Sequence, residues 1–298
     1  MDDRISVSVE QVKGLIADQF PELQNLTVSP ITHGGWNNRS FRLGQDLVVR
    51  LPAAERYQAQ VGRERLGMQK LPSGLPVDTP RFFAKGKPGQ GYPYEWSILH
   101  WVEGTALDAE AQIVDPGLAD EIGQFLSALH QAKPPANLAA DVDNFYRGGA
   151  LSHYDGETRR ALQHVPQAKR VLFTQLWEQA LSSAWQSAPV WVHGDIAPGN
   201  LLAKDGHLCG VIDFSMVAAG DPASDLAIAW THMDVTCRER FVSTLSLDQE
   251  CWQRARGWAL WKAAIVLAGE AAPAAHVAVS KRVLDTLISD VRIGNTKG

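Results

Sequence analysis

The segment 190–214 constrains the possible folds of this chain more than any other stretch. It reads as an apolar strand, then a loop of glycine, proline and asparagine, and then a short hairpin. Asp195 precedes Asn200 by five residues, and Asp213 directly follows the hairpin. The proline-glycine pair just before Asn200 lets the loop turn back on itself. We therefore expect these three polar side chains to face one cleft.

Two carboxylates and an amide at this spacing indicate phosphoryl transfer. In that chemistry one Asp orients an attacking hydroxyl and accepts its proton, while the Asn and the later Asp hold Mg²⁺ against nucleotide phosphates. Taken singly, each residue has a structural interpretation, because Asp195 could cap a turn and Asn200 could occupy the left-handed region. The three residues together favour the catalytic interpretation.

The chain changes character near residue 104. Before it we expect mainly strand, over 31–43 and 46–51 and in a hairpin over 81–85 and 92–102, with a helix over 57–71. After it, helices are expected over 115–129, 169–185, 224–231, 249–268 and 277–288. This predicts an α+β fold of two lobes, a small β-rich lobe with one main helix over 1–103 and a larger, mostly helical lobe over 104–298. The two lobes would join near 97–104.

Composition narrows the class of protein. With 45% hydrophobic and 20% charged residues, the chain has the values of an ordinary folded protein. Its 298 residues suffice for two domains or one bilobal unit. The 33 acidic residues outnumber the 28 basic ones, for a net charge of −5, which argues against a general nucleic-acid binder.

Cysteine usage and hydropathy point to the cytoplasm. The three cysteines are widely spaced without a CxxC pair, so neither a disulfide framework nor a zinc site is indicated. The first four residues, Met1-Asp2-Asp3-Arg4, are acidic and lack an apolar signal core. The most apolar late stretch, 258–268, is interrupted by Lys262 and is too short for a membrane span. We expect a cytoplasmic protein with no membrane or nucleic-acid partner.

Segments on both sides of 190–214 extend the pattern into a family resemblance. The residues that carry it are His33-Gly34-Gly35 and the rest of 33–43, the strand 47–52, His193-Gly194-Asp195, Asn200, Ile212-Asp213, Gly220-Asp221-Pro222 and Asp225-Leu226-Ala227. Over about residues 30–230 the chain resembles the aminoglycoside phosphotransferase family. The resemblance implies a protein-kinase-like fold. It also implies a kinase that moves the γ-phosphoryl group of Mg²⁺-bound ATP or GTP to a hydroxyl of a small molecule.

The resemblance also implies a role for each matching residue. Asp195 would be the catalytic base, and Asn200 and Asp213 would be the Mg²⁺ ligands. Asp225 would brace the catalytic loop through backbone N–H groups, and His193 would shape that loop as a structural hydrogen-bonding residue. The implied nucleotide-binding residues are Gly34, Gly35 and Ser40 in the loop over the phosphates, Arg50 paired with Glu64, and His100 and Val102 in the hinge.

Two departures from the family pattern keep an alternative open. Many kinases carry Lys where this chain has Arg50, and a guanidinium is longer and less compact than an ammonium group. The phosphate loop offers only Gly34-Gly35 in place of a full GxGxxG pattern. The alternative is a non-catalytic nucleotide-binding protein of the same fold. For Glu64, which arginines flank on both sides, the alternative is a solvated salt-bridge face.

The acceptor stays open at this point. An aminoglycoside-type antibiotic, with a role in antibiotic resistance, stands beside a macrolide, choline, homoserine, a fructosamine or a thioribose as alternatives. A polycation needs several converging carboxylates, since exposed single pairs are weak. Among the acidic residues of the helical half, Asp234 and Glu239 lie nearest to Asp225 in sequence, and we take them as candidate acceptor-binding residues. For the late tryptophans, 230, 252, 258 and 261, helical spacing favours core packing over a pocket.

Overall fold

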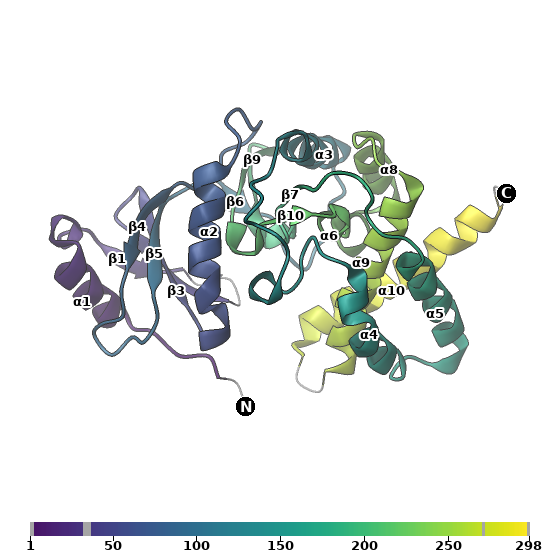
Figure 1. Ribbon diagram of the computed structural model, residues 1–298, viewed down its shortest axis with the longest axis horizontal. Helices are drawn as coiled ribbons and strands as arrows, with labels where there is room; N and C mark the ends of the chain where they lie inside the picture. The colour runs from purple at the N-terminus through teal and green to yellow at the C-terminus, as the bar shows by residue number, and fades with distance from the viewer. Residues whose placement is uncertain (1–2, 32–36, 270–271, 297–298) are drawn as a thin grey trace.

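The computed structural model describes residues 3–31, 37–269 and 272–296, and the first hundred of them build an antiparallel sheet with a helix on each side (Figure 1). The sheet has the strand order β1-β2-β3-β5-β4, with antiparallel neighbours throughout. Its elements are α1 (Val9–Gln19), β1 (Val28–Pro30), β2 (Asn38–Leu43), β3 (Leu47–Pro52), α2 (Gln58–Lys70), β4 (Phe82–Gly86) and β5 (Trp96–His100).

The alternation of side chains in β2 and β3 decides which face of the sheet each helix covers. Phe41 and Val49 are partners in the β2–β3 register, and both belong to one apolar cluster with Leu15 of α1. Successive side chains of a strand point to opposite faces. Ser40 and Arg50, also register partners, therefore face away from α1, and both line a cavity there.

The second half of the chain packs around α9, a helix of 20 residues that contacts α4, α5, α6, α7 and α10. Its core includes Phe125, Trp177 and Trp258, all fully buried. The helices are α3 (Pro116–Gln131), α4 (Asp155–Leu162), α5 (Gln167–Leu181), α6 (Ala223–Leu226), α7 (Ile228–Thr231), α8 (Val235–Ser243), α9 (Gln249–Ala268) and α10 (Ala274–Thr296). Five short strands, β6 (Thr105–Ala106), β7 (Val190–Val192), β8 (Leu201–Lys204), β9 (His207–Val211) and β10 (Ala218–Gly220), form the sheets β10-β7 and β6-β8-β9.

Helix α2 lies between the sheet and the helical half (Figure 1). It contacts the turn Phe214–Met216, which follows the hairpin of β8 and β9. Arg63 of α2 donates to the carbonyl oxygens of Ala139 and Val217, each at 3.1 Å, and pairs with Asp141. A buried guanidinium whose donors are satisfied from the other half of the molecule holds the two halves in one relative position.

The predicted α+β class is confirmed, and the helices expected over 57–71 and 249–268 correspond to α2 and α9. The expectation of mainly strand in the first hundred residues is wrong at α1. There Ser8 caps the helix by accepting the N–H of Gln11 at 3.1 Å, and apolar residues recur at helical spacing. Helices α4 and α8 were also not expected, and the helix expected over 224–231 is two short ones, α6 and α7.

Hydropathy gives one further result. Within the described ranges, no helix combines the length and the apolar character that crossing a membrane requires.

Gly220 of β10 tests how closely this strand packs against the loop that contains Gly148. A Cβ at this position would lie 2.0 Å from the carbonyl oxygen of Gly148, whereas a Cβ at Gly62 in α2 would meet nothing within 4 Å. We expect Gly220→Ala to lower the free energy of unfolding by about 1–3 kcal/mol through overpacking. Gly62→Ala should leave it unchanged or raise it by up to about 1 kcal/mol, because Ala favours helix. Urea denaturation measures both, and equal effects would contradict the close approach at Gly220.

Candidate active site

Asp225 of α6 holds the loop after β7 from behind. Its two carboxylate oxygens accept the backbone N–H groups of His193 and Gly194, each at 2.7 Å. Gly194 has a φ of +86°, and a Cβ there would lie 2.3 Å from the carbonyl oxygen of Met216, so this position requires glycine. Burial raises the pKa of Asp225, while the two N–H groups favour its charged form.

The imidazole of His193 links this loop to the end of β9. Nδ1 accepts the N–H of Asp195 at 3.2 Å, and Nε2 lies 3.0 Å from the carbonyl oxygen of Ile212. Both bonds are satisfied only when the proton is on Nε2. The ring is fully buried against Phe214, with centroids 4.6 Å apart. With both nitrogens engaged, His193 positions Asp195 and the residue that follows Ile212.

Asn200 is joined to Asp195 through its side-chain amide. Nδ2 donates to the backbone oxygen of Asp195 at 2.9 Å and to its Oδ2 at 3.2 Å. The backbone oxygen of Asn200 accepts the N–H of Ile212 at 2.9 Å, which fixes the loop against β9. Because the amide nitrogen is committed to Asp195, the oxygen Oδ1 of Asn200 is the atom that can face a cation.

Arg50 of β3 bridges two carboxylates from different parts of the chain. Its Nη2 lies 2.6 Å from Oδ1 of Asp213, and its Nη1 donates to Oε1 of Glu64 on α2. Glu64 is only 3% exposed, so it does not lie on a solvated face. Asp213 has a left-handed backbone with a φ of +65°, a conformation that Asp adopts more readily than most residues.

The three charges shift one another's pKa. Burial opposes the charge of Arg50, but Asp213 and Glu64 outweigh burial and raise the pKa of the guanidinium above its usual value. Burial also opposes the charge of Asp213, but Arg50 outweighs it and holds the pKa of this carboxyl below its usual range. For Glu64 burial prevails and raises the pKa to about 7. Of these two carboxylates, Asp213 is therefore the one more firmly held in its charged form.

The oxygen donors of Asn200 and Asp213 fit a Mg²⁺ ion. Kinase sites bind this ion through one or two protein side chains, with phosphate oxygens and water completing the octahedron. Within the part of the chain that the structure describes, no group of three or more His, Cys, Asp or Glu could hold a metal by itself. A Mg²⁺ ion held by Asn200 and Asp213 would take most of its six ligands from phosphate oxygens and water.

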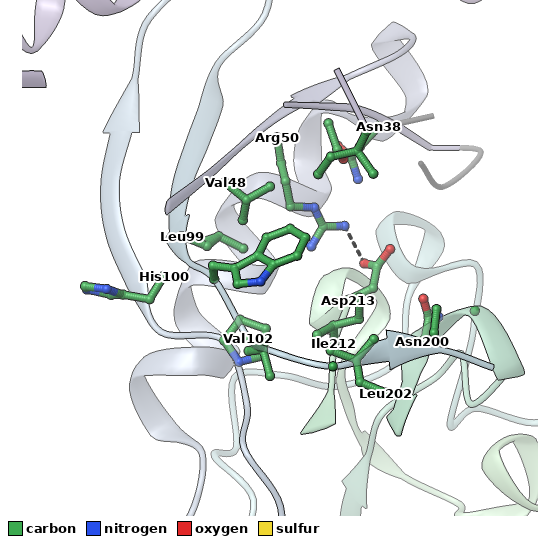
Figure 2. A pocket seen from close by; sticks show the side chains of 17 residues that line it. Asn38, Val48, Arg50, Leu99, His100, Val102, Asn200, Leu202, Ile212 and Asp213 are labelled. Atoms are coloured by element: carbon green, nitrogen blue, oxygen red, sulfur yellow. Dashed lines mark ion pairs between the residues drawn. The ribbon is translucent and has the colours of Figure 1, made fainter. Parts of the chain in front are cut away.

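An apolar cavity of about 280 Å³ opens beside the Arg50–Asp213 ion pair (Figure 2). Val48 and Leu99 line it from the sheet, and Leu202 and Ile212 line it from the hairpin on the opposite side. An apolar slot that ends in charged groups suits a ligand with a flat ring at one end and anionic groups at the other. Of the sequence-predicted residues, this cavity is lined by Ser40, Arg50, His100, Val102, Asn200 and Asp213.

Other predicted residues do not line this cavity, or line it without turning their side chains into it. Gly34 and Gly35 fall outside the described residues. The imidazole of His100 points away from the cavity (Figure 2). Asp234 is the N-cap of α8 and accepts the N–H of Cys237 at 2.8 Å, and Glu239 is exposed on the same helix. The side chains that contact the carboxylate of Asp195 include Asn200, from the same loop, and Lys262, from α9.

Two cations near Asp195 were not found from the sequence. The Nζ of Lys262, on α9, lies 3.9 Å from Oδ1 of Asp195. Arg147, in the loop before α4, is buried and interacts electrostatically with both Asp195 and Lys262. Lys262 did carry a signal, because it interrupts an apolar helix whose neighbouring residues are buried. Arg147 carried none, because its position depends on the packing of its loop against α9.

A family comparison identifies the chain. The model of the phosphotransferase enzyme family, APH, matches residues 27–258, which include Arg50, Asp195 and Asp213. The chain belongs to this family. It is therefore an APH-family phosphotransferase. A search of the curated proteins found no match.

Solved structures with the same fold include antibiotic phosphotransferases. The GDP complex of wild-type aminoglycoside 2′-phosphotransferase-IIIa aligns with a TM-score of 0.72 and 16% identity, covering 95% of this chain and 99% of that chain. A GDP and kanamycin complex of an APH(2″) enzyme aligns at 0.69 and 19%, covering 94% and 98%. Macrolide 2′-phosphotransferase MphH from Brachybacterium faecium aligns at 0.60 and 20%, covering 93% and 98%. At these identities the likeness shows the shared kinase-like fold.

Asp225 offers a test of how the loop is supported. We expect Asp225→Ala to lower the free energy of unfolding by about 2–4 kcal/mol, because two buried N–H groups lose their acceptor. Asp205→Asn, at an exposed hairpin turn with a φ of +52°, is the control and should change it by less than about 0.5 kcal/mol, because Asn tolerates the left-handed region. Urea denaturation measures both variants. Similar values for the two would show that Asp225 does not support the loop.

Proposed function

We propose that this phosphotransferase is a small-molecule kinase that transfers the γ-phosphoryl group of Mg²⁺-bound ATP or GTP to an acceptor hydroxyl. The observation that carries the proposal is that Asn200 and Asp213 line the charged end of an apolar cavity, while Asn200 is hydrogen-bonded to Asp195 just outside it. The apolar part suits a nucleobase, and the end with Arg50 suits the phosphates. The boundary between a nucleotide-binding part and an acceptor-binding part then falls near 97–104.

The geometry assigns each side chain a task. Asp195, bonded to Asn200 and a third exposed, orients the acceptor hydroxyl and takes its proton. The acceptor oxygen forms a bond to the γ-phosphorus as the bond from phosphorus to the β-phosphate oxygen breaks. Mg²⁺ held by Asn200 and Asp213 would neutralise charge on the phosphates. Arg50 adds positive charge from β3, and Glu64 fixes its guanidinium.

Bound molecules in the structural neighbours support a nucleotide and a hydroxyl acceptor. Neighbours have been solved with GDP, with ADP, and with ATP together with streptomycin. We accordingly expect ATP or GTP as cosubstrate and Mg²⁺ as cofactor. Aminoglycosides and macrolides are acceptors to test first, alongside small hydroxyl metabolites.

A coupled nucleotide-turnover assay tests the proposal against non-catalytic nucleotide binding. ATP and GTP are each supplied with Mg²⁺ and a panel of hydroxyl compounds that includes kanamycin and a macrolide. We expect turnover that requires both Mg²⁺ and one class of acceptor. A Mg²⁺-dependent thermal shift with nucleotide but no turnover would favour the non-catalytic alternative.

Asp195→Asn separates chemistry from binding. The amide cannot accept the hydroxyl proton but keeps nearly the same shape, so we expect kcat to fall by about 10²–10⁴-fold. Nucleotide affinity, measured by calorimetry, should change little, because Asp195 does not line the cavity. Asp205→Asn is the control and should keep full turnover. Full turnover in Asp195→Asn would contradict the assigned base.

Asp213→Ala tests the cation site. Nucleotide affinity in Mg²⁺ should fall by at least about tenfold, toward the value that the unaltered protein shows in EDTA, because one of two protein oxygen ligands is lost. Calorimetry with and without Mg²⁺ measures the difference. Thermal denaturation controls for the lost ion pair with Arg50. A Mg²⁺ dependence equal to that of the unaltered protein would contradict the role of Asp213.

A further inference from the structure

The two oxygens of the Asp195 carboxylate face different surroundings. Oδ2 accepts from Asn200, which lines the nucleotide cavity, whereas Oδ1 lies 3.9 Å from Nζ of Lys262. Lys262 does not line that cavity and comes from α9, in the core of the helical half. Lys262 therefore meets Asp195 from outside that cavity, where the acceptor of the proposed reaction would have to lie. Its side chain is 24% exposed, so a ligand can reach it.

Arg147 is a second cation, more deeply buried than Lys262, and it interacts electrostatically with Lys262. Among the described residues, five arginines are buried, and four of them, Arg50, Arg63, Arg238 and Arg254, have a carboxylate partner. Arg147 is 8% exposed, and its Nε and Nη1 have no hydrogen-bond partner in the described part of the chain. Its guanidinium instead lies over two indoles, 4.6 Å from the ring centroid of Trp261 and 5.1 Å from that of Trp258.

The described anions that interact with these cations, in residues 3–31, 37–269 and 272–296, already have hydrogen-bond partners. Asp225 accepts the backbone N–H groups behind the loop, and Glu157 accepts the indole N–H of Trp261 at 2.7 Å. Asp195 is shared between Asn200 and Lys262. Burial lowers the pKa of Lys262, and repulsion from Arg147 lowers it further against the opposing pull of Asp195. A further anion beside Lys262 would thus stabilise both cations.

We infer that Lys262, with Arg147 beneath it, binds an anionic group of the acceptor, a carboxylate or a phosphate, next to the hydroxyl that is phosphorylated. The inference rests on the proposed kinase function, since it is the reacting hydroxyl at Asp195 that brings its neighbouring groups within reach of Lys262. A charge-assisted hydrogen bond from Nζ would orient such an acceptor. The amino groups of a polycationic acceptor would instead be repelled by the two cations, Lys262 and Arg147.

The described carboxylates of this region, which do not include residues 270–271, are mostly engaged elsewhere and form no polycation-binding surface among themselves. Asp155 accepts from the indole of Trp177 and from Arg159, and Asp234 caps α8. Glu157 is an exposed carboxylate that interacts electrostatically with Arg147. A single exposed carboxylate contributes little to binding a polycation.

Acceptor selectivity tests the inference. A panel of hydroxy acids, sugar acids and sugar phosphates is assayed with Mg²⁺ and ATP or GTP, each compound against its uncharged amide or parent alcohol and against kanamycin. We expect the highest kcat/KM in the anionic class, and the carboxylate and phosphate arms identify which group is bound. In Lys262→Met the ratio of kcat/KM for acid over neutral partner should fall at least about tenfold. Lys262→Arg should restore much of it.

Controls separate this inference from the proposed function. Lys204→Met, at an exposed position on β8, should leave the ratio unchanged. Best turnover with kanamycin or with neutral partners would overturn the inference, and so would a Lys262→Met variant whose kcat/KM falls equally for acid and neutral partner. If no compound is turned over, the kinase proposal fails. Calorimetry then measures the affinity of the enzyme, with Mg²⁺ and ADP, for each anionic compound and for its neutral partner. Tighter binding of the anion that is lost in Lys262→Met supports the anion site. Equal binding of the anion and its neutral partner overturns the inference.

Discussion

The guanidinium of Arg50 is the contact on which the arrangement of the site depends. It belongs to a sheet strand, Glu64 belongs to the helix packed on that sheet, and Asp213 belongs to the hairpin of the helical half. Each of these side chains is largely buried, and a buried charge is tolerated only when paired. The three groups therefore hold the sheet, α2 and the end of the hairpin that carries Asp213 in one relative position.

A second set of contacts shapes the loop that carries Asp195. The carboxylate of Asp225 binds two successive N–H groups, and His193 bonds both to Asp195 and to Ile212. Neither Asp225 nor His193 lines the cavity, so both side chains support the loop from behind. Asp195 and Asn200 are consequently presented with little freedom, which is the form of preorganisation that phosphoryl transfer needs from a protein. Buried residues, Asp225 and His193, support the loop, and other residues, Asp195 and Asn200, are partly exposed toward the ligand.

The fold by itself does not determine the acceptor, because related folds carry different specificities. In this chain the residues that we propose for the acceptor side come from α9 and from the loop before α4, outside the segments that carried the family resemblance. Lys262 and Arg147 give that side a positive character. The candidates chosen by closeness in sequence, Asp234 and Glu239, lie on α8, where Asp234 serves the helix itself.

The sequence alone predicted the α+β class, the helices α2 and α9, and the residues Asp195, Asn200 and Asp213 as one group. These features are local, since helical periodicity, turn residues and the spacing within one loop and hairpin are set by neighbours along the chain. The tertiary structure alone decided that Lys262 meets Asp195 and that Arg147 lies buried without a carboxylate partner. Such contacts join residues more than 60 positions apart, or a loop to a core helix, and arise from how α9 packs. No local pattern encodes which face of a mostly buried helix turns toward the active-site loop.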